Sequence, residues 1–163
     1  MARYDASSAE ILVFTFKEGL LSAVAHDLKL KATKFTLEVE GTTAKLELDA
    51  RSLRVVTAMK GGVEATSAIS ASKFGEIEQS AADDVLEVKR FPFIEFVSTQ
   101  VSQTEVVGKL TLHGQSRDVR GTRNGNSAEF RLDQRTFGIK PFSAMLGALK
   151  VKPEVTIRVF IFE

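Results

Sequence analysis

The chain has 163 residues, of which 44% are hydrophobic and 26% charged, and its formal net charge is +1. These values predict one soluble globular domain over residues 1–163, long enough to bury a sizeable core. The weak net charge argues against a nucleic-acid-binding protein, and the absence of cysteine excludes disulfides, thiolate catalysis and zinc–thiolate sites.

The first ten residues are polar and do not form the basic-then-apolar pattern of a secretory signal. No apolar run approaches the ~20 residues that a membrane-spanning helix needs. We therefore expect a cytoplasmic protein without an integral membrane segment, or a periplasmic one if a leader has been trimmed from the sequence.

The first half of the chain is typical of β-strands. Residues 11–16 predict the first strand, and residues 28–40 predict a second one whose apolar phase slips, which indicates a bulge near Thr33 and Lys34. A turn at residues 41–43 leads into a strand in which Ala44, Leu46 and Leu48 alternate with charged residues. This pattern predicts a hairpin with one dry and one wet face.

The middle of the chain predicts one helix from Ser70 or Ser72 to about Val88, with a break near Gly75. Arg90 precedes Phe91-Pro92, where the helical pattern ends, because the residue before a proline disfavours helix.

Strands return in the second half, over residues 92–101, 105–113 and 117–123. Asn124-Gly125 predicts a tight hairpin into a further strand that includes Phe130. Pro141 then predicts the start of a short helix, whose apolar stripe is Phe142, Met145, Leu146 and Leu149. Residues 155–162 form the final strand, and its two-sided apolarity at Phe160 and Phe162 would suit a homodimer contact.

The elements add up to about eight strands and two helices, so the chain is mainly β. Antiparallel strands in such a number favour a closed barrel or a sandwich. Twelve Phe with one Tyr and no Trp would suit either a dense core or a greasy cavity.

Several runs of residues resemble the YceI-like family of lipid-binding proteins. The strongest are FPFIEF at 91–96, GKLTLHGQSRDV at 108–119 and RTFGI at 135–139, and weaker ones lie at 20–28 and 52–56. The resemblance implies an eight-stranded antiparallel barrel similar to that of lipocalins. It also implies that a polyisoprenoid, an isoprenoid quinone or a fatty-acid-like lipid is bound inside, with roles in transport or stress response.

A long apolar ligand needs a dry slot lined by inward side chains, since burying its surface is worth ~25 cal/mol per Å². Each candidate taken alone is as well explained by ordinary core packing. The late helix would be either a lid or a plug. The candidate ligand-binding residues are Phe14, Phe16, His26, Phe35, Leu37, Leu46, Phe93, Phe96, Leu110, Leu112, Phe130, Phe142, Met145 and Leu146, together with the inward face of residues 155–161.

His26, beside Asp27, is the most reactive-looking residue. Adjacent residues on a strand point to opposite faces, so the two do not form a dyad unless a turn intervenes. His113 precedes Gly114 at a strand end, where a turn-stabilising hydrogen bond is the better reading. With two His and no Cys we expect neither a metal site nor a cofactor.

The sequence thus predicts a non-catalytic carrier of a long-chain isoprenoid or lipid. Two alternatives remain open. One is an enzyme that acts on a lipid-like substrate with His26 as acid or base. The other is a structural barrel with a filled interior that acts through protein partners.

Overall fold

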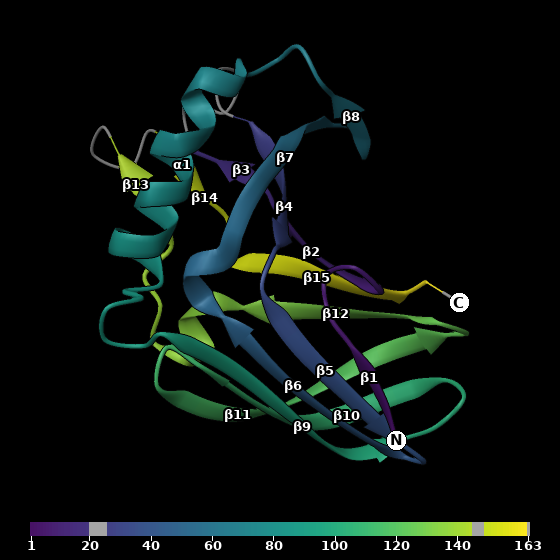
Figure 1. The fold of residues 1–163 in the computed structure, drawn as a ribbon. Coiled ribbons are helices and arrows are strands. Elements are labelled where there is room, and N and C mark those ends of the chain that lie inside the picture. The colour runs from purple at the N-terminus through teal and green to yellow at the C-terminus, as the bar shows by residue number, and fades with distance from the viewer. Residues whose placement is uncertain (20–25, 145–148, 163) are drawn as a thin grey trace.

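The structure is a computed structural model that describes residues 1–19, 26–144 and 149–162. Antiparallel strands dominate it, as predicted, and one helical stretch lies along one side (Figure 1). The strands are β1 (Ala2–Tyr4), β2 (Ala9–Thr15), β3 (Lys17–Glu18), β4 (Asp27–Ala32), β5 (Phe35–Glu40), β6 (Thr43–Asp49), β7 (Leu53–Lys60), β8 (Val63–Ala65), β9 (Phe93–Val101), β10 (Glu105–Leu112), β11 (Gln115–Asn124), β12 (Ser127–Asp133), β13 (Ser143–Ala144), β14 (Leu149–Val151) and β15 (Glu154–Ile161). The helical segments are η1 (Ala50–Ser52), η2 (Ala71–Lys73), α1 (Phe74–Ser80), η3 (Ala81–Val85) and η4 (Gln134–Phe137).

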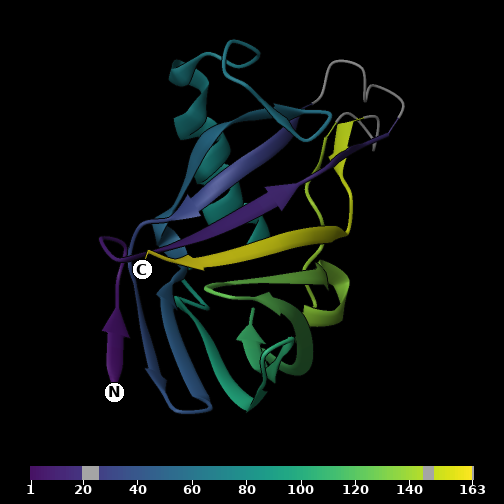
Figure 2. The same ribbon diagram turned by 90° about the vertical axis from the view of Figure 1, so that its right-hand side faces the viewer.

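The expected closed barrel of eight strands is wrong in two respects. In the described part of the chain, twelve strands form one sheet in the order β1-β5-β6-β9-β10-β11-β12-β15-β2-β4-β7-β8, and no hydrogen-bonded pair joins its two ends. A separate three-stranded sheet has the order β13-β14-β3. The main sheet is strongly bent, and Figures 1 and 2 show it curving back toward itself.

Two distant parts of the main sheet are connected by a short stretch of chain and not by strand pairing. β4 pairs with β2 and β7, whereas β5 pairs with β1 and β6, and only Thr33 and Lys34 separate β4 from β5. The phase slip in the sequence marks this corner, although a bend replaces the expected bulge. Sequence alternation could not show that one continuous segment would supply two different positions in the sheet.

Ser52 holds the corner in place of strand pairing. Its backbone carbonyl accepts the Thr33 N–H at 3.1 Å and the Thr33 hydroxyl at 2.7 Å. Its hydroxyl accepts the Lys34 N–H at 3.1 Å, and the side chain is buried. The polar groups at the bend therefore keep hydrogen-bond partners, although Thr33 and Lys34 themselves are exposed.

The central helix is present but shorter than predicted. α1 begins at Phe74, so Gly75 lies in its first turn and does not break it. The chain then passes into η3, a π-helical turn, and the Val88 N–H bonds the Ala82 carbonyl at 2.9 Å. The Glu78 carboxylate accepts the Val55 N–H at 2.9 Å, which fixes α1 to β7.

The predicted late helix is wrong at residues 143, 144 and 149, which lie in strands, whereas residues 145–148 lie outside the described part of the chain. Ser143 and Ala144 form β13, and the chain returns as β14 to pair with β3. The Val151 N–H bonds the Phe142 carbonyl at 3.0 Å, and the Lys152 N–H bonds the Phe16 carbonyl at 2.8 Å. Backbone pairing with the distant β3 thus overrides the helical spacing of the apolar residues.

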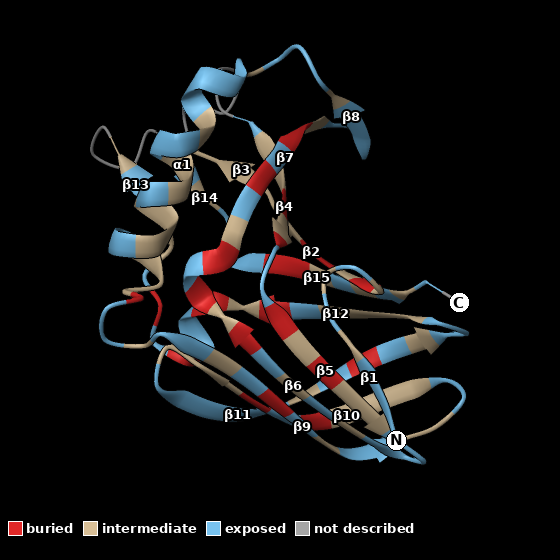
Figure 3. Cartoon of the chain, viewed as in Figure 1, coloured by how far each residue is buried: buried red, intermediate tan, exposed pale blue. Residues whose placement is uncertain are grey.

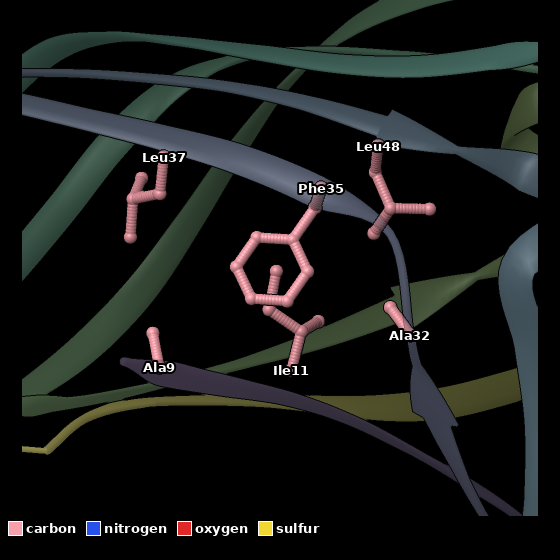
Figure 4. Packing of buried hydrophobic residues seen from close by; sticks show 6 residues of the cluster. All are labelled: Ala9, Ile11, Ala32, Phe35, Leu37 and Leu48. Atoms are coloured by element: carbon pink, nitrogen blue, oxygen red, sulfur yellow. The ribbon is translucent and has the colours of Figure 1, made fainter. Parts of the chain in front are cut away.

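Two groups of buried apolar residues lie within the bent sheet, and exposed residues cover α1 and β11 on the outside (Figure 3). Leu46, Ile94 and Ile157 pack against both groups. The corner cluster, in which side chains of β5 and β6 face those of β2 and β4, is Ala9, Ile11, Ala32, Phe35, Leu37 and Leu48 (Figure 4). The η4 cluster is Phe96, Leu110, Leu132, Phe137, Ile139 and Val155.

Candidate functional site

Between the two clusters lies a cavity of about 760 Å³, partly open to solvent. This volume is within the range of ~300–1,000 Å³ that small-molecule sites occupy. Apolar side chains from the strands and from α1 and η3 form most of its wall. The main ones are Ile11, Val13, Leu28, Leu30, Leu37, Val39, Leu46, Leu48, Ile77, Val85, Leu86, Ile94, Phe96, Val106, Leu110, Leu112, Val119, Phe130, Leu132, Phe142, Val155, Ile157, Val159 and Ile161.

β15 shows how strand alternation builds this wall. Val155, Ile157, Val159 and Ile161 all line the cavity, whereas Arg158 on the other face pairs with Glu129. At ~3.3 Å per residue, the lining residues from Val155 to Ile161 extend the wall over about 20 Å. The prediction that the inward face of residues 155–161 points into an open interior therefore agrees with the structure.

Eight of the fourteen candidate residues line the cavity, and their role in binding stays a prediction. Most are strand residues whose alternate neighbours are also inward. The eight are His26, Leu37, Leu46, Phe96, Leu110, Leu112, Phe130 and Phe142. Met145 and Leu146 lie outside the described residues.

Phe14, Phe16 and Phe93 do not line the cavity, because they lie on the opposite strand parity from the residues that do. On β2 the inward residues are Ile11 and Val13, and the ring of Phe14 lies under the Arg158 guanidinium at 4.9 Å. On β9 the inward residue is Ile94, which leaves Phe93 51% exposed. The outward face carries aromatic residues too, so residue type alone could not settle the phase.

Phe35 differs from these three. It is buried within the corner cluster, beside Ile11 and Leu48 (Figure 4), and it supports the wall without lining the cavity.

Sequence reasoning missed several lining residues on β2, β4 and the helical segment. Ile11, Val13, Leu28, Leu30, Ile77 and Val85 all line the cavity. On β2 the odd-numbered residues Ile11 and Val13 point inward, whereas the prediction chose the even-numbered Phe14 and Phe16. For Ile77 and Val85, the helical spacing was recognised, but nothing in the sequence placed that face over the cavity.

Polar lining residues lie in two places, one near β3, α1 and β14 and the other near the β11–β12 hairpin. Lys17, His26, Glu76 and Lys150 come from β3, the start of β4, α1 and β14, which gather at one end (Figure 1). Arg123 lines the cavity near the β11–β12 hairpin, where its guanidinium donates to the carbonyls of Gly125 at 3.1 Å and Ser102 at 3.0 Å. The long middle is apolar, which suits a ligand with a long tail.

His26 is exposed and lines the cavity, but its neighbour is engaged elsewhere. The Asp27 carboxylate accepts the Lys17 N–H at 2.7 Å, which ties β4 to β3. Among residues 1–19, 26–144 and 149–162, no hydrogen bond joins the His26 ring to the Asp27 carboxylate.

His113 has a structural place at the turn after β10. Its Nε2 lies 2.5 Å from a Glu87 carboxylate oxygen, and its Nδ1 lies 3.3 Å from the Phe137 carbonyl oxygen. These two contacts connect Glu87, which follows η3, to Phe137 at the end of η4. Hydrogen bonds with His113 and Arg90 hold the pKa of the Glu87 carboxyl below its ordinary value of 4.5.

Within residues 1–19, 26–144 and 149–162, no three His, Asp or Glu side chains are grouped so that they could hold a metal ion. In the same residues, no helix has the length and apolar content to span a membrane.

Solved structures share this fold at low sequence identity. Burkholderia cenocepacia BcnA superposes with a TM-score of 0.60 and 17% identity over 95% of this chain and 96% of its own. A polyisoprenoid binding domain from Saccharophagus degradans, implicated in plant cell wall breakdown, gives a TM-score of 0.56 and 9% identity over 99% and 97% of the two chains. These likenesses establish the fold. No curated protein matches the sequence closely enough to count as a relative.

The family assignment rests on the sequence match. Residues 76–161, more than half of the chain, match the YceI-like domain. The stretch includes the three runs at 91–96, 108–119 and 135–139 that suggested the resemblance. The protein therefore belongs to the YceI-like family.

Proposed function

We propose that this protein is a non-catalytic carrier that holds a long-chain amphiphile, such as a polyisoprenoid, an isoprenoid quinone or a fatty-acid-like lipid, in the cavity. The observation that carries the proposal is the cavity of about 760 Å³ with an apolar middle between two separate clusters. A packed structural barrel predicts a filled interior, so the cavity argues against that alternative.

Tail burial supplies most of the affinity in this proposal. Transfer of apolar surface from water is worth ~25 cal/mol per Å², and association costs offset part of it. The polar residues at the end formed by β3, α1 and β14 position the head of the ligand. The name of the Saccharophagus degradans domain supports a polyisoprenoid as the first candidate.

The non-catalytic part of the proposal rests on the surroundings of His26. A general base needs a group that orients it, and Asp27 accepts a backbone N–H from Lys17 instead. An enzyme acting through His26 would lose turnover in His26→Ala while keeping its ligand.

The test is organic extraction of the purified protein, before and after incubation with geranylgeraniol, followed by mass spectrometry. We expect a long-chain species at near-stoichiometric yield. Ile157→Trp should abolish most of it, because Ile157 lines the middle of the cavity and an indole would fill the space. The matched control is Phe160→Trp on the same strand, where the side chain is 43% exposed and does not line the cavity.

Retention by Phe160→Trp should equal that of the unaltered protein. A clean extract from the unaltered protein under both conditions would overturn the carrier proposal. Equal yields from Ile157→Trp and Phe160→Trp would show that the ligand lies somewhere other than the cavity.

The homodimer contact is a separate proposal. Phe160 and Phe162 are 43% and 45% exposed, and their ring centroids are 5.6 Å apart on the outside of the main sheet. Their exposure supports an interaction surface.

A further inference from the structure

Two phenylalanine rings meet inside the cavity although their strands are not neighbours. Phe96 on β9 and Phe130 on β12 line the cavity, and their ring centroids are 5.9 Å apart at 64°, an edge-to-face contact. β10 and β11 lie between these strands in the sheet. Each ring therefore reaches across a neighbouring strand.

Each ring lies on a glycine of the strand that it crosses. A Cβ at Gly108 of β10 would lie 2.5 Å from Phe96 Cζ, and a Cβ at Gly121 of β11 would lie 2.5 Å from Phe130 Cε2. Carbon atoms in contact are ~3.5–4.0 Å apart, so a methyl group at either glycine would displace the ring by about 1 Å.

The two glycines occupy positions where a side chain would point into the cavity. On β10 the flanking residues Val106 and Leu110 line it, and on β11 Val119 and Arg123 do. Gly108 and Gly121 are buried and do not line the cavity themselves, because the rings cover them. Glycine thus lets each ring lie against the wall where any other residue would push it inward.

The rings have other lining residues beside them on their own strands, Ile94 before Phe96, and Ala128 and Leu132 on the two sides of Phe130. In the strand register Phe96 is opposite Leu46, and Phe130 is opposite Ile157, and all four residues line the cavity. We call these four residues the waist. Lining residues continue past it toward the hairpin turns, as at Ala44 and Ala128, and toward the helix, as at Ile77.

We propose that Gly108 and Gly121 are positioning residues that set the longest ligand chain, because they let Phe96 and Phe130 lie back and keep the waist open. This inference rests on the proposed carrier function. A short chain fits on one side of the waist, whereas a long chain has to pass it. A side chain at Gly121 would therefore discriminate against long chains alone.

Gly121→Ala is the cleaner variant. Its Cβ would contact only ring atoms of Phe130 among the three nearest atoms, whereas a Cβ at Gly108 would also lie 2.5 Å from the Val97 carbonyl oxygen. The matched control is Gly75→Ala in α1, where a Cβ would have no heavy atom within 4 Å. The double variant Gly121→Ala/Phe130→Leu replaces the displaced ring with a smaller side chain and should restore the passage.

The experiment offers each protein an equimolar mixture of farnesol and solanesol in mild detergent, followed by gel filtration, extraction and mass spectrometry. The two probes share an allylic alcohol head and differ in chain length. We expect Gly121→Ala to lower the retained solanesol-to-farnesol ratio by about fivefold or more, as overpacking costs of ~1–3 kcal/mol imply. Gly75→Ala should leave the ratio unchanged, and the double variant should recover it.

The outcomes separate this inference from the carrier function. If the unaltered protein retains neither alcohol, the carrier function fails and this inference fails with it. If it retains both and Gly121→Ala gives the same ratio, or lowers both alcohols equally, the glycines have a structural role only and the inference alone is overturned. Should Gly121→Ala not fold, Leu46→Trp narrows the waist from β6, the strand beside β9, and must lower the same ratio.

Discussion

The turns at residues 48–52 and 132–136 have similar local sequences, LDARS in the first and LDQRT in the second. They nevertheless stabilise different parts of the molecule. Leu48 belongs to the corner cluster and Leu132 to the η4 cluster. In both turns an aspartate oxygen accepts the backbone N–H of the arginine two residues later at 2.9 Å, which caps a short 3₁₀ helix.

The two turns diverge at their last residue. The first ends in Ser52, which is buried and holds the corner between β4 and β5 through hydrogen bonds. The second ends in the exposed Thr136 and continues to Phe137, which is 2% exposed and fills the η4 cluster. The aspartate caps both turns in the same way. The buried side chain that follows differs: Ser52 stabilises the first turn through hydrogen bonds, and Phe137 stabilises the second through apolar packing.

Among variants of the two turns, Phe137→Ala should lower the free energy of unfolding most. Removing a fully buried phenylalanine costs about 3–5 kcal/mol in the free energy of unfolding, because a cavity replaces the ring. Urea unfolding measures it. The matched control is Phe93→Ala, which should cost about 1 kcal/mol since half of that side chain is already in water. Equal losses in the two variants would contradict the importance of the η4 cluster.

Ser52→Ala should have an intermediate effect. It removes the buried hydroxyl that accepts the Lys34 N–H, which costs about 1 kcal/mol, because Lys34 is exposed and water replaces part of the lost bond. Thr136→Ala, at the corresponding position of the second turn, is exposed and should stay within about 0.5 kcal/mol of the unaltered protein. A Ser52→Ala variant as stable as Thr136→Ala would show that packing alone holds the corner.

Asp133→Asn should have the smallest effect, and it depends on pH. Hydrogen bonds from the Arg135 side chain and backbone hold the pKa of the Asp133 carboxyl below its ordinary value of 3.8. A lowered pKa contributes stability above pH 3.8 that is lost as the pH falls through the lower folded value.

Asparagine keeps the cap but lacks the charge. The stability difference between the two proteins should thus be constant above pH 3.8 and shrink below it, as urea unfolding at several pH values measures. A difference that does not change with pH would contradict the role of the ion pair.

The regular hairpins could be predicted from the sequence because each combines strict alternation with a turn residue. Leu46 and Leu48 alternate with charged residues after Gly41, and β5 and β6 form the expected pair. The predicted tight hairpin is present, and Gly125 adopts φ 59° as the first of its two turn residues, Gly125 and Asn126.

Other parts depend on partners that are far away in the sequence. Val151 pairs with Lys17 across the small sheet, and this pairing turns the stretch around Phe142 from the expected helix into a strand. Phe14 and Phe93 were candidates because they are large and apolar, but both lie on the outward face of their strands. Phe14 contacts Arg158 there, and Phe93 lies in register with Asp49 of β6. No local pattern carries this information.

The place of β15 in the sheet determines when the cavity can form during synthesis of the chain. β15 lies between β12 and β2, segments more than a hundred residues apart in the sequence, and it hydrogen-bonds to both. Until residues 154–161 have emerged from the ribosome, the facing edges of β12 and β2 have no strand to join them. The cavity, whose wall includes Val155, Ile157, Val159 and Ile161, therefore forms only in a chain that has been synthesised at least as far as Ile161.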